Sequence, residues 1–145
     1  MTAIIISGHG QLSTGLLDAF HMVFGEDQKI VAVPFLNGEG IPQLQAKFKA
    51  QLAKFSPDEE VLFMVDVFGG TPYNSATQLI FGQDKMDVVT GVNLPMLLEV
   101  AGVKDSVPLS ELTSMLKVIN QESFKIFSEQ IKAIRTEDLE EDDLL

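Results

Sequence analysis

A histidine between two glycines is the first residue of this sequence that could do chemistry. His9 stands in the stretch "IIISGHGQLSTG" (residues 4–15), where an apolar run gives way to a helical pattern. The glycines put no side chain beside the imidazole. A carboxylate that binds one ring nitrogen would turn the other outward as a nucleophile. The second histidine, His21, lies within the helical pattern and has no visible partner, which indicates a structural or exposed residue.

Asp66 is the carboxylate best placed to serve His9. It ends the third apolar run, "EVLFMVD" at 60–66. A hydrogen bond from the imidazole to this carboxylate would select one tautomer and stabilise the ring once it became cationic. We therefore predict that His9 and Asp66 form a pair.

A glycine-rich turn follows Asp66 and leads into a helical pattern. Gly69, Gly70 and Thr71 stand before Pro72, and Thr71 is the predicted N-cap. Backbone N–H groups at a helix start bind anions well. We predict that Gly69, Gly70 and Thr71 hold a phosphoryl group. Tyr73 and Asn74 follow, and either lining the site or packing and capping would explain them equally well.

The periodicity of the chain predicts the elements that must position these residues. Apolar, β-branched runs predict strands at 2–7, 29–35, 60–66 and 86–92. Helical spacing predicts a helix from Leu12 to Val23, helices at 40–55, 71–81 and 95–102, and one long helix that begins near Ser110. Alternation of buried strands with helices is typical of a parallel sheet covered on both faces.

The fold class we predict is a three-layer α/β/α domain of flavodoxin-like type, with about four parallel strands. In a 2-1-3-4 strand order, strands 1 and 3 are neighbours, and ligands bind beyond the carboxyl ends of the strands. His9, Asp66 and the glycine turn would all lie at that edge. We expect one domain at 1–135 and an acidic tail at 136–145.

Composition excludes several classes of partner and site. The net charge is -11, which disfavours nucleic acid, and six of the acidic residues lie in "EDLEEDDLL" at 137–145, which indicates a solvated, frayed terminus. The chain has no cysteine and only two histidines, so we expect no metal site and no cofactor. Without a signal segment or an apolar run long enough to span a bilayer, a cytoplasmic protein is expected.

Each of these features alone also has a structural explanation. Gly-His-Gly can be a tight strand-to-helix connection, a strand-terminal aspartate can cap a loop, and Gly-Gly-Thr-Pro can start a helix.

A histidine phosphatase would need arginines at the site, and the only arginine of the sequence is Arg135. A nucleotide kinase would need a phosphate-binding loop that is absent. A histidine that accepts a phosphoryl group and donates it again is the reading that remains.

Four stretches resemble a known family. They are "IIISGHG" (4–10), "FGE" (24–26), "LFMVDVFGGTPYNSA" (62–76) and "VVTGVNLPMLLE" (88–99), in the family's order and spacing. The chain is similar to the enzyme IIA component (EIIA) of mannose-family phosphoenolpyruvate-dependent sugar phosphotransferase systems (PTS), a group that serves mannose, fructose, sorbose and N-acetylgalactosamine. The resemblance implies that the membrane components, and not EIIA, contact the sugar.

The resemblance implies a cytoplasmic phosphotransferase component acting through a phosphohistidine. His9 would accept the phosphoryl group from the phosphocarrier HPr on Nε2 and pass it to an enzyme IIB component. Asp66 matches the family's aspartate partner, and Gly69, Gly70 and Thr71 match the loop near the phosphate. The membrane components IIC and IID would be indirect partners. Known dimers of the family exchange an edge strand, which implies a homodimer and an extra strand.

The sequence departs from the family pattern after about residue 103, and an acidic tail replaces the linker to IIB that many members have. We therefore expect IIB to be a separate chain. Two alternatives stay open at this stage. One is the phosphoryl donor subunit of phosphoenolpyruvate-dependent dihydroxyacetone kinase. The other is a regulatory module in which His9 only binds a ligand.

Overall fold

The computed structural model describes residues 1–144, with side chains described through residue 136. The strands are β1 (Thr2–His9), β2 (Ile30–Phe35), β3 (Glu60–Val65) and β4 (Met86–Val89). The helices are α1 (Leu12–Val23), α2 (Ile41–Leu52), α3 (Thr71–Ile80), α4 (Leu94–Val103), α5 (Leu109–Glu122) and α6 (Phe127–Leu144). Among residues 1–144, no helix is both long enough and apolar enough to cross a membrane.

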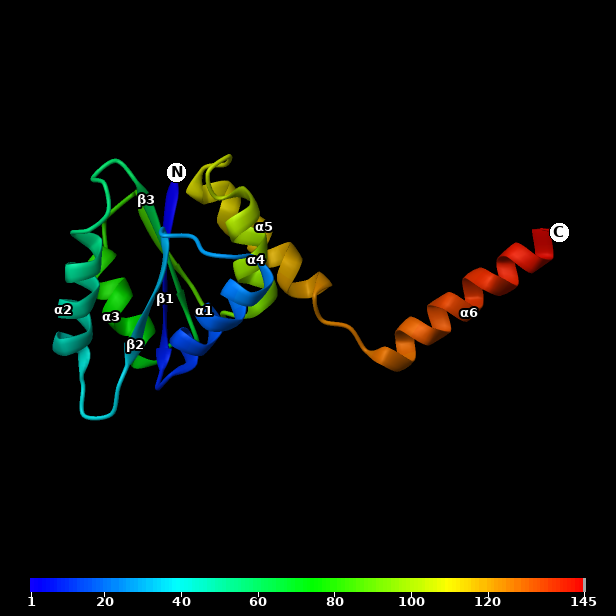
Figure 1. The fold of residues 1–145 in the computed structure, drawn as a ribbon, viewed down its shortest axis with the longest axis horizontal. Helices are drawn as coiled ribbons and strands as arrows, with labels where there is room; N and C mark the ends of the chain where they lie inside the picture. The colour runs from blue at the N-terminus through cyan, green and yellow to red at the C-terminus, as the bar shows by residue number, and fades with distance from the viewer. Residues whose placement is uncertain (145) are drawn as a thin grey trace.

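The four strands form one parallel sheet in the order β2-β1-β3-β4, which confirms the predicted order. Helices α2 and α3 cover one face, and α1, α4 and α5 cover the other, so the architecture is the predicted three-layer α/β/α sandwich (Figure 1). The central strand β1 alternates its side chains between two cores. Ile4 and Ile6 enter the core under α4 and α5, and Ala3 and Ile5 enter the core under α2. Burial on both faces explains the continuous apolar run.

The register brings the carboxyl ends of β1 and β3 together. Ser7 of β1 pairs with Val65 of β3, and His9 pairs with Phe35 of β2. His9 is the last residue of β1, and Asp66 is the first residue beyond β3. The two residues at the centre of the prediction therefore leave the sheet at the same edge.

Several element boundaries differ from the prediction. The predicted long C-terminal helix is two helices, α5 and α6, because the chain breaks helical geometry between Glu122 and Phe127. The backbone stays helical to Leu144, where the sequence predicted a frayed terminus, and Leu145 lies outside the described residues. Helix α6 extends away from the body of the molecule (Figure 1).

Two further boundaries matter for the site. Gly70, not Thr71, is the N-cap of α3; it makes no side-chain cap bond, and Thr71 is the first helical residue. Strand β4 ends at Val89 rather than at 92, because Gly91 turns the chain with a φ of 72°. Helix α4 then begins after Asn93 and continues through Gly102 to Val103, so Gly102 does not end it.

Candidate functional site

His9 and Asp66 form the predicted pair, although 57 residues separate them in the chain. The Oδ2 atom of Asp66 lies 2.7 Å from Nδ1 of the His9 ring. The same oxygen accepts the backbone N–H of His9 at 2.9 Å. One carboxylate oxygen therefore holds both the main chain and the side chain of the histidine.

The carboxylate determines which ring nitrogen is available. Burial by itself raises the pKa of Asp66, but hydrogen bonds from the His9 N–H, the His9 ring and the Val67 N–H outweigh it and hold the pKa below its ordinary value. An ionised carboxylate only accepts hydrogen bonds, so Nδ1 carries the proton. In the neutral ring Nε2 keeps its lone pair, and no described residue hydrogen-bonds it. The histidine side chain is 52% exposed and the aspartate 12% exposed.

Two glycines allow this pair to form. A Cβ atom on Gly8 would lie 3.2 Å from Cγ of Asp66, and one on Gly70 would lie 3.1 Å from Cε1 of His9. Gly8 therefore lets the carboxylate approach β1, and Gly70 lets the imidazole pack on the start of α3. By contrast, a Cβ on Gly10 would meet open space, and its φ of 60° shows that this glycine serves the turn into α1.

Comparison with known proteins assigns the chain to a family. The model of the family EIIA-man, described as PTS system fructose IIA component, matches residues 3–117. The chain belongs to the EIIA-man family.

Relatives of this EIIA-man chain support the assignment. It is 44% identical to the PTS system fructose-specific EIIA component of Bacillus subtilis, over 99% of this chain and 100% of that protein. It is 36% identical to the mannose-specific EIIAB component of Escherichia coli, over 85% of this chain but 38% of that longer protein. A solved structure of PTS component EIIA from Streptococcus agalactiae has a TM-score of 0.81 and 26% identity, covering 89% of this chain and 99% of that one.

In this EIIA-man chain, the predicted phosphate loop lies beside the imidazole. Gly69 has a φ of 79° and Gly70 precedes α3. The N–H of Gly70 donates to Val67 O at 3.3 Å, so the turn itself uses one of the three predicted donors. The N–H groups of Gly69 and Thr71 have no hydrogen-bond partner among the described residues.

Asn74 and Tyr73 have structural roles at this loop. The Asn74 side chain donates to Gly69 O at 3.0 Å and braces the turn. The Tyr73 ring lies 4.8 Å from the ring of Phe68, centroid to centroid. Both side chains therefore pack against the predicted phosphate loop, and a role in lining the site stays a prediction.

The sequence reasoning missed an aromatic residue that packs on His9 and three exposed apolar residues that follow β2 and β3 at the same edge of the sheet. The Phe35 ring meets the imidazole edge-on, with centroids 5.5 Å apart and the planes at 82°. Phe68 is 78% exposed, and Val67 and Leu36 are exposed with it. The available signal for Phe68 was an aromatic residue directly before the Gly69-Gly70 pair. His21 is exposed on α1 and does not reach the site, in agreement with the prediction.

Proposed function

We propose that this chain is a cytoplasmic phosphoryl carrier: His9 accepts a phosphoryl group from HPr and passes it to an enzyme IIB component, which drives sugar uptake through IIC and IID. The observation that carries the proposal is the 2.7 Å contact between Nδ1 of His9 and Oδ2 of Asp66. It leaves Nε2 as the nucleophile on an exposed ring. Membership of the EIIA-man family supports the same role.

The bonds and charges of the proposed transfer step balance between the donor's phosphohistidine and the His9 ring. The Nε2 lone pair attacks the phosphorus of the donor's phosphohistidine, and a new P–N bond forms as the old one breaks. The electron pair of the broken bond returns to the donor's ring nitrogen, so the donor leaves as a neutral imidazole. The His9 ring becomes cationic with its proton still on Nδ1, and the charge of Asp66 stabilises it. Transfer to IIB is the same step in reverse, with a different partner.

The loop before α3 would stabilise the transferring group. Gly69, Gly70 and Thr71 lie at a helix N-terminus beside the imidazole. The available N–H groups of Gly69 and Thr71, with the positive end of the helix dipole, suit the equatorial phosphoryl oxygens. Positioning and electrostatic stabilisation are the main catalytic requirements of phosphoryl transfer.

Phosphoryl labelling tests the proposal. HPr phosphorylated by phosphoenolpyruvate and enzyme I should label the chain with acid-labile, base-stable phosphate. His9→Ala should take up no label, and His21→Ala, which removes the exposed histidine of α1, should label like the unsubstituted chain. Persistent label in His9→Ala would refute the assignment, and no covalent phosphate in the unsubstituted chain would favour a binding module.

The acceptor separates the two carrier hypotheses. The labelled chain should pass its phosphate to IIB and not to the ADP-binding subunit of dihydroxyacetone kinase. The reverse preference would assign the chain to the kinase. The family match and the PTS names of the relatives favour IIB.

We also propose that the chain works as a homodimer with an exchanged edge strand. Strand β4 ends the sheet with one side unpaired among the described strands. Residues 123–126 leave α5 without helical geometry, and Phe124 and Ile126 are 74% and 42% exposed. Alternating apolar residues in an extended segment suit addition as a strand to the open edge of a second copy's sheet.

A further inference from the structure

A turn after β4 holds the backbone of Asp66. The N–H of Gly91 donates to Asp66 O at 2.8 Å, and the N–H of Val92 donates to Val65 O at 3.0 Å. These two bonds attach the turn at residues 90–93 to the end of β3, where the site begins. The turn therefore fixes the backbone of Asp66, the residue whose carboxylate binds His9.

A single side chain, that of Asn93, holds the turn in shape. Its Oδ1 accepts the N–H of Met96 at 3.0 Å, which caps α4. Its Nδ2 group donates to Gly91 O at 3.2 Å and to Asn120 Oδ1 at 3.1 Å. The Met96 N–H fixes the orientation of the amide, because only its oxygen can accept. Both amide hydrogens therefore point at the turn and at α5.

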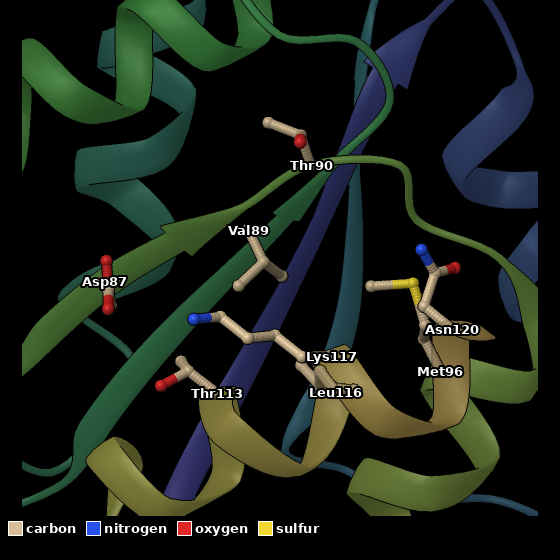
Figure 2. A pocket seen from close by; sticks show the side chains of 8 residues that line it. All are labelled: Asp87, Val89, Thr90, Met96, Thr113, Leu116, Lys117 and Asn120. Carbon is tan, nitrogen blue, oxygen red and sulfur yellow. The ribbon is translucent and has the colours of Figure 1, made fainter. Parts of the chain in front are cut away.

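The contact with Asn120 connects the turn to another part of the molecule. Asn120 lies on α5 and, with Thr90, lines a pocket of 380 Å³ between β4 and α5. Figure 2 shows Thr90 beyond the arrow of β4 and Asn120 on the α5 ribbon, with Met96 of α4 beside Asn120. The path from α5 to the site runs through Asn120, Asn93, Gly91 and Asp66.

We propose that Asn93 is a positioning residue for the His9–Asp66 pair, and that Asn120 supports it from α5. The inference rests on the proposed function. Asn93 touches neither the imidazole nor the transferring group; it acts by keeping Gly91 against the Asp66 carbonyl. If the turn loosens, the Asp66 carboxylate no longer stays within hydrogen-bonding distance of Nδ1 of His9. The ring then populates both tautomers. Misplacement of a reacting group by about 1 Å can slow a reaction by up to about 100-fold.

Asn93→Ser is the variant that isolates this role. Serine keeps a good N-cap for α4 but is too short to donate to Gly91 or Asn120, and it adds no charge. We expect phosphoryl transfer from phosphorylated HPr to slow about tenfold, with KM for the donor unchanged. Asn120→Ala removes only the support from α5 and should give a smaller loss in the same direction. Asn120→Asp keeps the accepting oxygen and is the matched control that should transfer normally.

A spectroscopic readout tests the inference without any partner protein. Nitrogen-15 NMR of the free, unsubstituted chain should show His9 protonated on Nδ1. The same measurement on Asn93→Ser should show a mixture of the two tautomers. A chemical denaturation curve should show that the Asn93→Ser variant is folded under these conditions. If Asn93→Ser and Asn120→Ala keep both the single tautomer and the full transfer rate, the inference is wrong. If the unsubstituted chain shows the single tautomer and Asn93→Ser shows the mixture, but the unsubstituted chain takes no phosphate from HPr, the proposed function fails and the positioning role of Asn93 stands.

Discussion

At the scale of single residues, Asp66 organises the site through its two carboxylate oxygens. Oδ2 accepts the backbone and ring N–H groups of His9, and Oδ1 accepts the N–H of Val67 at 2.9 Å. The carboxylate therefore orients the imidazole of His9 and binds the first residue of the loop before α3. Substitution of Asp66 should affect both chemistry and stability, and pH separates the two effects.

Asp66→Asn should slow phosphoryl transfer. A hydrogen bond to a charged group contributes about 1.5–3 kcal/mol, so loss of the charge facing the cationic ring predicts roughly a tenfold to hundredfold slower transfer. Single-turnover transfer from phosphorylated HPr measures this. Transfer at the unsubstituted rate would remove Asp66 from the mechanism.

The same variant predicts a pH dependence of stability. The pKa of Asp66 in the folded chain lies below its ordinary value of 3.8, so its ionised form stabilises the fold at higher pH. That contribution is complete above the ordinary value and is lost as the pH falls through the folded-state pKa. Asp66→Asn should therefore be less stable than the unsubstituted chain at neutral pH, with a gap that narrows in acid. A constant gap in urea unfolding across this range would contradict the linkage.

Gly70→Ala should displace the imidazole of His9 without straining the backbone. Gly70 has φ -73° and ψ 170°, which alanine adopts freely, but its Cβ would lie 3.1 Å from His9 Cε1 and 3.0 Å from Val67 Cγ2. We expect transfer to slow about tenfold because the ring must shift. Gly82→Ala is the control: its φ of 82° strains the chain, while its Cβ would meet open space. It should lose stability and keep its transfer rate; equal transfer losses in both variants would show that the effect of Gly70→Ala is not local.

At the scale of elements, the two ends of the sheet have different tasks. The carboxyl ends carry the His9 site, and the amino ends carry a network of charges. Lys104, at the end of α4, is only 2% exposed and lies 3.3 Å from Asp27 Oδ2 and 3.3 Å from Asp105 Oδ1. Glu59, before β3, is paired with Lys29. The Lys104–Asp27 pair joins the end of α4 to the loop before β2, and the Lys29–Glu59 pair joins that loop to the loop before β3, both at the opposite edge of the sheet from His9.

Lys104→Ala should destabilise the fold by about 3 kcal/mol, because it leaves Asp27 without its buried partner and removes the packed stem. Lys104→Met keeps most of the stem and should cost less. Chemical denaturation measures both variants. Phosphoryl transfer should be unchanged in Lys104→Met, since the network lies at the opposite edge from His9; equal stability of the alanine variant and the unsubstituted chain would show that the pair adds nothing.

At the scale of the whole molecule, the compact sheet and helices contrast with the C-terminal region. Helix α6 extends from the body, and the exposed segment at 123–126 joins it to α5 (Figure 1). The family model ends at residue 117, before this region. The predicted division into a domain at 1–135 and a tail at 136–145 stays a prediction. The exposed Phe124 and Ile126 lie in this region and are the residues on which the homodimer proposal depends.

The homodimer proposal predicts a dimer in analytical ultracentrifugation. Phe124→Ser and Ile126→Ser should each weaken dimerisation about tenfold or more, because they remove apolar residues from the proposed exchanged strand. Phe81→Ser is the matched control, since Phe81 is 91% exposed beyond α3. A monomeric unsubstituted chain, or equal effects of all three substitutions, would contradict the proposal.

Much of this protein was predictable from the sequence because the signals are local. Apolar period predicted the four strands, and the residue types at the strand ends predicted His9 and Asp66; the strand order came from the flavodoxin-like fold type, which the structure shows. Local spacing also misled: Leu12 and Val23 continue the stripe of α1 but are exposed, because only part of that stripe faces the sheet. The continuous pattern after Ser110 likewise concealed the break between α5 and α6.

Only the tertiary structure decided how distant residues meet. The parallel register of β1 and β3 sets the 2.7 Å contact between His9 and Asp66. Close approaches through space, not flanking position, show that Gly8 admits the carboxylate and Gly70 the imidazole. The bond between Asn93 and Asn120 joins residues 27 apart, on two elements. Such contacts depend on how strands and helices pack together, and no local pattern of residues records that packing.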